Sequence, residues 1–437
     1  MLSQRTRAVE SERPDRRNAC PGLTRMVMAK DGAIARIKLR LGRLTTEQAY
    51  ALADIAERFE AEAIELSIRS NIQLRGIAPA RWEAVVAALY EAGLGADNPA
   101  ADDIRNVMAS PTAGIDPGQI CNAASLASDL LAMLQANEAF YALSPKFSLQ
   151  VDGGENCAMI SHPGDIWLSA MEGGEAYAFG LASSPDKDAL GAIAARDALP
   201  FVEALLHHFL RYRDFTRMKH LFETVPQQEF LSGLARECPF DIGPAAGWKR
   251  RQTAAFSHLG IHAQAGNAFY IGAMPLMGRL TPAQLRGLAS LTGNELRLTP
   301  WQGVLLPHIA GAQTGEIADN LRALDLEISP QSAHARLRAC SGLNGCVSAL
   351  ADTQADGTKL AACLAPGTAP VHLTGCAKSC AALAPLPFTL LARSAEHYDL
   401  YSQASFPQDG TGPARFGQLL ATDITIDDAA HLLNARH

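Results

Sequence analysis

Two segments of the chain that lie far apart share one order of hydrophobic and polar positions. In the first, apolar and basic residues alternate over residues 37–41, which predicts a half-buried strand. A threonine and a glutamine with the spacing of a capping box follow, and they predict a helix over residues 45–59. A second strand is expected over residues 64–68, and a second amphipathic helix over residues 80–93.

The second segment repeats this order. The pattern Gly-Arg-Leu-Thr-x-x-Gln occurs at residues 42–48 and again at 278–284, with the capping threonine and glutamine in both copies. Strands are predicted over residues 269–274 and 296–298, and a closing helix over 316–324. Chance similarity between two amphipathic helices is the alternative, but the capping residues and the order of elements agree, so we interpret the pattern as an internal repeat.

A long insertion separates the two copies of the repeat. It is predicted to contain strands near residues 147–151 and 166–169, and helices near 200–212 and 227–237. A segment rich in proline and glycine, residues 238–247, then leads into the second copy. We therefore expect the following units: a flexible tail (1–19), a first half-domain (20–95), a first α/β lobe (96–237), a linker (238–250), a second half-domain (251–325) and a second α/β lobe (326–437).

The composition narrows the class of protein without identifying it. Of the 437 residues, 48% are hydrophobic and 19% are charged, which is ordinary for a globular protein. The net charge of −7 argues against general nucleic-acid binding, and no apolar run is long enough for a membrane span. Residues 1–18 mix arginine with acidic residues, so we expect a solvated tail and no secretory signal.

Four of the nine cysteines form two pairs, Cys340 with Cys346 and Cys376 with Cys380. Without an export signal, an odd number of cysteines favours a reducing cytoplasm, where grouped cysteines bind metal or do redox work. Four thiolates can hold an iron–sulfur cluster, and the longer C-x5-C and C-x3-C loops favour a cluster over a structural zinc site, which usually uses C-x2-C pairs. Cys363, between the pairs, is expected to be a small buried hydrophobe.

The two cysteine pairs, with Gly375 before the second, resemble the 4Fe-4S motif of the sulfite and nitrite reductase family. The repeated halves resemble that family's tandem ferredoxin-like half-domains, each followed by an α/β lobe. The resemblance covers about residues 20–395. It implies an α/β (α+β) fold with pseudo-two-fold symmetry and a 4Fe-4S cluster whose ligands are Cys340, Cys346, Cys376 and Cys380.

Three stretches of the first half extend the resemblance. Residues 67–73, 105–107 and 144–147 are similar to the family's Thr-x-Arg-x-Asn-x-Gln, Arg-Asn-Val and Pro-Arg-Lys-Phe-Lys stretches. In the reductases, the basic groups of these stretches surround the carboxylates and the reacting centre of sirohaem. Arginine is suited to bidentate pairing with carboxylates, although each cation alone could be a solvated charge. By position, the resemblance implies contact with a macrocycle for Arg69, Asn71, Gln73, Arg105 and Lys146.

Departures from the reductase pattern point to one branch of the family. Ser148 replaces a second lysine, and the loop Cys376–Cys380 reads Cys-Ala-Lys-Ser-Cys where the reductases have Cys-Pro-Asn-Gly-Cys. Residues 18–25, 147–154 and 298–302 instead resemble the precorrin-3B synthases. That branch handles a modified uroporphyrinoid as its substrate.

This branch implies a monooxygenase of aerobic cobalamin biosynthesis that converts precorrin-3A to precorrin-3B. The reaction uses O2 to hydroxylate a meso carbon, closes a lactone, and takes reducing equivalents from NADH through a separate electron donor. We find no dinucleotide fingerprint, which agrees with an external donor. The branch also implies a mononuclear non-haem iron, but the histidines are too scattered for us to assign its ligands.

Two other functions remain open from the sequence. The first is a sirohaem-dependent sulfite or nitrite reductase. The second is a non-enzymatic iron–sulfur electron carrier or a zinc-stabilised binding protein, for which the repeated halves and basic stretches would have no purpose. In every case, we expect a cytoplasmic protein with no nucleic-acid or membrane partner.

Overall fold

A computed structural model describes residues 20–382, 386–403 and 416–436. The predicted tail, residues 1–19, lies outside these ranges. Within them, the strands form four sheets of five strands each. None of the helices described there has both the length and the apolar character needed to span a membrane. The fold is the predicted one, mixed α/β with tandem ferredoxin-like half-domains.

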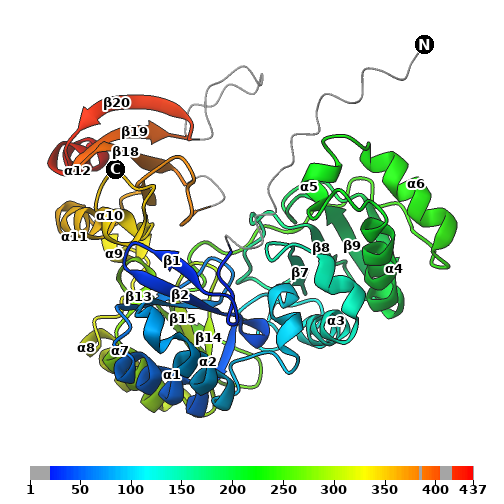
Figure 1. The fold of residues 1–437 in the computed structure, drawn as a ribbon, viewed down its shortest axis with the longest axis horizontal. Helices are drawn as coiled ribbons and strands as arrows, with labels where there is room; N and C mark the ends of the chain where they lie inside the picture. The colour runs from blue at the N-terminus through cyan, green and yellow to red at the C-terminus, as the bar shows by residue number, and fades with distance from the viewer. Residues whose placement is uncertain (1–19, 383–385, 404–415, 437) are drawn as a thin grey trace.

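Two sheets lie at the centre of the molecule, one for each copy of the repeat, and helices cover one side of them (Figure 1). The first sheet has the order β1-β2-β5-β4-β13. The strands of this sheet and the helices of the first half are β1 (Val27–Ala29), β2 (Gly32–Ile37), β4 (Ala63–Leu66), β5 (Ile72–Ile77), β13 (Arg279–Leu280), α1 (Thr46–Arg58) and α2 (Trp82–Glu91).

The second central sheet has the equivalent order β11-β12-β15-β14-β3. Its strands and the helices of the second half are β11 (Gly260–Ala263), β12 (Phe269–Ala273), β15 (Val304–Ile309), β14 (Glu295–Leu298), β3 (Arg43–Thr45), α7 (Pro282–Leu291) and α8 (Thr314–Ala323). The predicted capping boxes are present at both helix starts, at Thr45 with Gln48 and at Thr281 with Gln284. The apolar faces of α1 and α7 pack into one core shared by both halves.

Each half-domain gives one strand to the other's sheet. Strand β3 of the first half pairs with β14 of the second, and β13 of the second half pairs with β4 of the first. Both pairings are antiparallel. The two halves therefore cannot separate without the loss of an edge strand from each sheet.

The strand predicted over residues 37–41 is wrong beyond Ile37. Strand β2 ends at Ile37, and Leu41 has a left-handed φ of 54°, as Met277 does in the second half with a φ of 48°. At the glycine that follows Leu41, a Cβ would come within 2.8 Å of the Cβ of Ser70. The alternating apolar residues 37–41 are buried by a tight turn against a neighbouring loop, and not by a continued strand.

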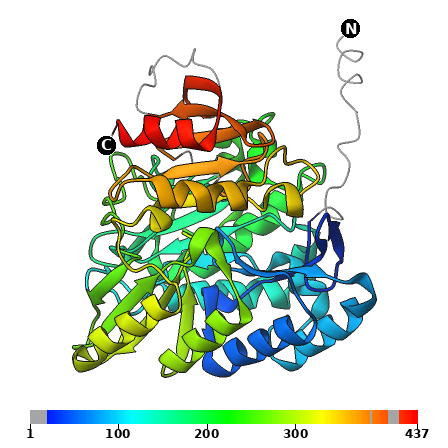
Figure 2. The same ribbon diagram turned by 90° about the vertical axis from the view of Figure 1, so that its left-hand side faces the viewer.

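The two lobes lie on the opposite side of the central sheets from α1, α2, α7 and α8 (Figures 1 and 2). In the first lobe, β6, β7 and β8 are parallel, and β9 and β10 add antiparallel strands. The helix predicted over residues 227–237 is present with these bounds and is labelled α6. The elements of this lobe are β6 (Val107–Ala109), β7 (Leu149–Asp152), β8 (Ile166–Ala170), β9 (Ala176–Leu181), β10 (Gly191–Ala194), α3 (Ala124–Ala136), α4 (Ala198–Leu210), α5 (Met218–Leu221) and α6 (Gln227–Glu237).

The second lobe repeats this topology. Strands β16, β17 and β18 are parallel, and β19 and β20 follow as antiparallel strands. Its described elements are β16 (Leu337–Ala339), β17 (Val371–Thr374), β18 (Phe388–Ser394), β19 (His397–Ser402), β20 (Gln418–Ile424), α9 (Ala333–Arg336), α10 (Gly342–Gly345), α11 (Thr353–Cys363) and α12 (Ile426–Asn434).

Each lobe contacts the central sheet of the other half. In the first lobe, the carbonyl oxygens of Pro111 and Ala113 accept hydrogen bonds from Arg297 on β14. In the second lobe, the carbonyl oxygen of Gly345 accepts one from Arg75 on β5. This reciprocal docking follows the predicted pseudo-two-fold symmetry, and it places the loop with the first cysteine pair over the first half-domain.

Candidate cluster and substrate site

The four paired cysteines lie at one edge of the second lobe. Cys340 directly follows β16, and Cys376 follows β17 by one residue, Gly375. These two strands are parallel neighbours, so their carboxyl ends meet at the same edge of the sheet. The backbone N–H of Gly375 donates to the Cys340 sulfur at 3.3 Å, and a Cβ on Gly375 would come within 2.6 Å of the Cβ of Ala349.

The remaining two thiols share this neighbourhood. Burial raises the pKa of the Cys380 thiol, and the negative charges of Cys340, Cys376 and Cys346 raise that pKa further. Four thiols that repel one another when ionised are stabilised as thiolates by a positively charged inorganic centre. The chemistry of this donor set fits a 4Fe-4S cluster.

Within the described ranges, no group of three or more His, Cys, Asp and Glu side chains is placed to hold a single metal ion. A 4Fe-4S cluster does not need several ligands around one metal ion, because each thiolate binds a different iron. For the mononuclear iron that the resemblance implies, the described residues offer no ligand set.

Cys363 differs from the sequence prediction. It lies at the end of α11 and is exposed, whereas a buried position was expected. The buried stripe of this helix is formed by Thr353, Gly357, Leu360 and Ala361, and with 3.6 residues per turn Cys363 lies on another face. Cys121 is partly buried, and Cys157 and Cys238 are buried.

A row of polar side chains crosses the first central sheet toward the cysteines. Arg36, Gln73, Glu65 and Arg279 lie opposite one another on successive strands, so their side chains share one face. This face meets the cysteine loop, where the Ser341 hydroxyl donates to Glu65 at 3.2 Å. The predicted substrate residue Gln73 therefore belongs to the face on which both lobes dock.

Ion pairs fix the cysteine loop to this face. Arg75 is 4% exposed; it pairs with Asp31 at 2.8 Å and with Glu65 at 3.5 Å, and it donates to the Gly345 carbonyl at 2.7 Å. Arg279 pairs with Glu65 from the other side at 2.7 Å. The guanidinium of Arg75 is buried together with the carboxylates of Asp31 and Glu65 and the carbonyl of Gly345. The removal of one partner would therefore leave an uncompensated buried charge.

At the other end of the row lie three arginines and a histidine, which we call the cation cluster: Arg36, Arg69, Arg217 and His162. Burial lowers the pKa of Arg69 to about 10, and the positive charges of Arg217 and Arg36 lower it further. Arg69 donates to the Lys146 carbonyl at 3.1 Å, while Arg217 pairs with Asp165 at 2.9 Å. Cations thus outnumber the nearby carboxylates, which favours an anionic ligand.

His162 is the most deeply buried member of the cation cluster, at 5% exposure. Burial lowers its pKa to about 3, and Arg69 and Arg217 contribute to this shift. The ring is therefore neutral near pH 7. Its Nε2 atom is buried without a hydrogen-bond partner, although a buried polar atom normally has one. A carboxylate entering between the two guanidinium groups could supply that partner.

The opening residues of the described chain also contact this cluster. The N–H of Arg36 donates to the Gly22 carbonyl at 3.3 Å, and Arg25 donates to the Cys20 carbonyl at 2.8 Å. The Cys-Pro-Gly-Leu stretch that carries part of the resemblance is therefore packed beside the cations. Asn18 and Ala19, which begin that stretch, lie outside the described residues.

The predicted substrate residues are only partly brought together. Arg69 and Lys146 meet at the cation cluster, where Lys146 is exposed. Arg105 is 8% exposed and donates to the carbonyls of Lys38 and Gly95 at 2.7 and 3.1 Å, so its guanidinium is directed away from the cluster. Asn71 accepts a hydrogen bond from the N–H of Leu39 at 2.8 Å, which is a structural role.

Three members of the cation cluster were not predicted from the sequence, namely Arg36, His162 and Arg217. They come from β2, from the loop before β8 and from the residue before α5. No spacing or motif connects these segments. Only the docking of the first lobe on the first half-domain makes them neighbours.

Comparisons with known proteins agree with this architecture. Residues 27–92 and 262–324 match the model of the nitrite/sulfite reductase ferredoxin-like half domain. Residues 100–240 match that of the nitrite and sulphite reductase 4Fe-4S domain, and together these matches span more than half of the chain. The 4Fe-4S domain match covers the first lobe, whereas the four paired cysteines lie in the second lobe, which has the same strand order.

Curated relatives come from two groups. The chain is 28% identical to a precorrin-3B synthase from Sinorhizobium sp over 387 residues, which are 86% of this chain and 81% of the relative. It is also 28% identical to the chloroplastic ferredoxin–nitrite reductase of Zea mays, over 79% of this chain and 67% of the relative. Among solved structures, the Mycobacterium tuberculosis NirA protein aligns with a TM-score of 0.74 at 19% identity, covering 92% of this chain and 79% of that chain. This last likeness concerns the fold alone.

The environment of His162 leads to a prediction about its titration. Its pKa of about 3 lies below the ordinary value of 6.5, so the unfolded chain takes up this proton first and the folded state loses stability as pH falls below about 6.5. NMR should show no protonation of His162 between about pH 8 and about pH 5. Arg69→Gln should raise its pKa by on the order of one unit. Arg58→Gln, which replaces an exposed arginine at the end of α1, should leave that pKa unchanged.

Proposed function

The chain belongs to the nitrite and sulfite reductase superfamily, and we propose that within it the chain is an iron–sulfur monooxygenase that converts precorrin-3A to precorrin-3B in aerobic cobalamin biosynthesis. One observation carries this proposal. A cluster of partly buried cations and a set of four thiols flank the same polar sheet face, which suits a polycarboxylate substrate placed beside an electron store. The precorrin-3B synthase relative, aligned over most of both chains, supports it.

We assign the cluster to Cys340, Cys346, Cys376 and Cys380 in the second lobe. When bound, a 4Fe-4S cluster supplies single electrons to the site. The other residues around the thiols contribute by holding them in position. The ion pairs of Arg75 and Glu65 hold the Cys340–Cys346 loop against the first half-domain, and the N–H of Gly375 directs the Cys340 sulfur. Outer contacts of this kind fix thiolate orientation.

We assign the substrate's acetate and propionate groups to the cation cluster of the first lobe and first half-domain. Arg69 and Arg36 provide forked donors for carboxylates, and Lys146 is placed at the exposed rim. Neutral His162 can donate or accept one further hydrogen bond at Nε2. Several cations converging on one ligand would orient the macrocycle, and O2 and electrons from an external NADH-linked donor would complete the reaction.

Ser148 distinguishes this proposal from the reductase alternative. The sequence resemblance places a second reductase lysine at this position, but Ser148 is 1% exposed and its N–H donates to Asp165 at 3.0 Å. A buried serine cannot deliver a charge to an oxyanion. The alternative, a sirohaem-dependent sulfite or nitrite reductase, is supported by the nitrite reductase relatives, since the same cation cluster would also pair with the carboxylates of sirohaem.

Absorption and turnover of the purified protein separate the two functions. After anaerobic cluster reconstitution, we expect a spectrum of an iron–sulfur cluster without a Soret band. With O2 and an electron donor, the protein should convert precorrin-3A to a product that has gained oxygen from O2. A tightly bound haem together with reduction of sulfite or nitrite would overturn the proposal in favour of the reductase.

Replacement of one thiol tests the cluster ligands. Cys380→Ser should abolish the cluster, measured as iron and acid-labile sulfide per chain, because oxygen is a poor substitute for a soft thiolate. Cys363→Ser is the matched control, since this exposed thiol lies at the end of α11 and should leave the cluster content unchanged. Full iron and sulfide in Cys380→Ser would show that another residue is the fourth ligand.

Removal of Arg69 tests the substrate site separately. Arg69→Ala should raise the Kd for precorrin-3A roughly tenfold to a hundredfold, because it removes a charge-assisted pair with a carboxylate. Cluster content should stay the same, since Arg69 lies at the end of the polar row away from the cysteines. Arg58→Ala, which replaces an exposed arginine at the end of α1, should change neither quantity. A collapse of cluster content in Arg69→Ala would contradict our placement of Arg69.

A further inference from the structure

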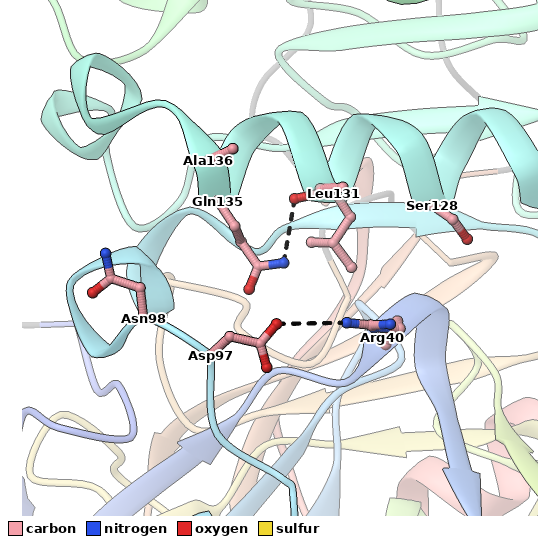
Figure 3. A pocket seen from close by; sticks show the side chains of 8 residues that line it. Arg40, Asp97, Asn98, Ser128, Leu131, Gln135 and Ala136 are labelled. Carbon is pink, nitrogen blue, oxygen red and sulfur yellow. Dashed lines mark hydrogen bonds and ion pairs between the residues drawn. The ribbon is translucent and has the colours of Figure 1, made fainter.

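Two adjoining cavities lie where the first lobe meets the first half-domain. They have volumes of about 310 and about 390 Å3, and Arg40, Asp97, Ser128 and Gln135 line both of them. Figure 3 shows the smaller cavity beneath helix α3, with Arg40 and Asp97 facing each other across it. Cavities of this size are at the lower end of the range for small-molecule sites.

Basic residues outnumber acidic residues in the lining of the larger cavity. Lys38, Arg40, Arg43 and Arg105 contribute to it, whereas its acidic residues are Asp97 and Glu295. Asp97 lies 3.9 Å from Arg40 and Glu295 lies 3.8 Å from Arg43, while the close partner of Glu295 is Arg297, outside the lining, at 2.6 Å. The lining thus has two positive charges more than negative ones. A concave site with such an excess attracts anions.

Two of these cations are buried and keep unused hydrogen-bonding capacity. Arg105 is 8% exposed, and its Nε atom is buried without a hydrogen-bond partner. Lys38 is 1% exposed, and its ammonium donates to the Asp102 carbonyl at 2.7 Å. Burial lowers the pKa of Lys38 to about 8 in spite of the nearby carboxylates of Asp102 and Asp103, which means that its charge is not fully compensated.

The equivalent turn of the second half packs closely on its neighbouring helix. The turn at Leu41 packs beside α3, and the turn at Met277 packs beside α11 in the same way. There, the Met277 sulfur lies 2.3 Å from the position that a Cβ on Gly357 of α11 would take. Met277 is 3% exposed, so its side chain occupies the space against that helix.

We propose that these cavities form a binding site for a small anion that carries more than one phosphate or carboxylate group. Arg40 is placed between the two compartments, with its side chain 70% exposed, and can pair with a ligand in either. Asp97 competes for Arg40 when the site is empty. The side chains of Gln48, Ser128 and Gln135 add neutral donors. This site uses none of the cysteines and none of the cation cluster.

Two substitutions of exposed residues test the proposal. One removes a positive charge from the lining, and the other removes a negative charge. Titration calorimetry of the cluster-loaded protein with inorganic pyrophosphate, and separately with citrate, should show one saturable site. Arg40→Ala should weaken binding about tenfold or more, because a charge-assisted hydrogen bond is lost. Asp97→Asn should tighten binding, because the competing carboxylate is removed. Both side chains are mostly exposed, so neither change threatens the fold.

Arg58→Ala is the matched control, since this exposed arginine of α1 lies outside the lining and should leave both affinities unchanged. A preference for pyrophosphate would identify phosphate as the ligand group, and a preference for citrate would identify carboxylate. Saturable binding of neither probe would overturn the proposal. So would equal affinities in Arg40→Ala and the unaltered protein, or weaker binding in Asp97→Asn.

Discussion

The exchange of one strand between the half-domains is the constraint on which the rest of the structure depends. Strand β13 crosses from the second half and brings Arg279 opposite Glu65 on β4. Glu65 then accepts from Arg279 and Ser341 and pairs with Arg75, so that a single carboxylate joins both half-domains to the cysteine loop. The position of the thiols relative to the first sheet therefore follows from a pairing between residues more than two hundred positions apart.

The same scaffold carries different chemistry at its two pseudo-equivalent places. Ser110 follows β6 as Cys340 follows β16, so the first lobe lacks the first thiol of the set. Arg69 directly precedes Ser70, whose side chain packs on Gly42. At the equivalent place in the second half, Trp301 directly precedes Gln302, whose side chain packs on Gly278. Trp301 is stacked on His258 at 4.1 Å between ring centroids, whereas Arg69 faces other cations. At this place the second half thus holds a stacked aromatic pair, whereas the first half holds cations that can bind an anionic ligand.

The sequence was sufficient where local chemistry decides the outcome. Capping residues at Thr45 and Thr281 marked two helix starts correctly, because an unsatisfied helix N-terminus needs a local partner. The repeat of this pattern identified the two halves. The alternation at residues 37–41 misled because a buried turn against Ser70 also requires apolar side chains at alternate positions. Periodicity reports burial, and it does not report the backbone conformation that produces it.

By itself, the sequence determined the fold class, the tandem halves and the grouping of Cys340, Cys346, Cys376 and Cys380, because each depends on residues close together in the chain or on a repeated pattern. Only the tertiary structure decided which cations meet. Arg69 joined Arg36, His162 and Arg217, while Arg105 turned to backbone carbonyls beside a separate cavity. The physical reason is that a guanidinium has five donors and a long side chain, so its partners are set by whichever lobe docks against it.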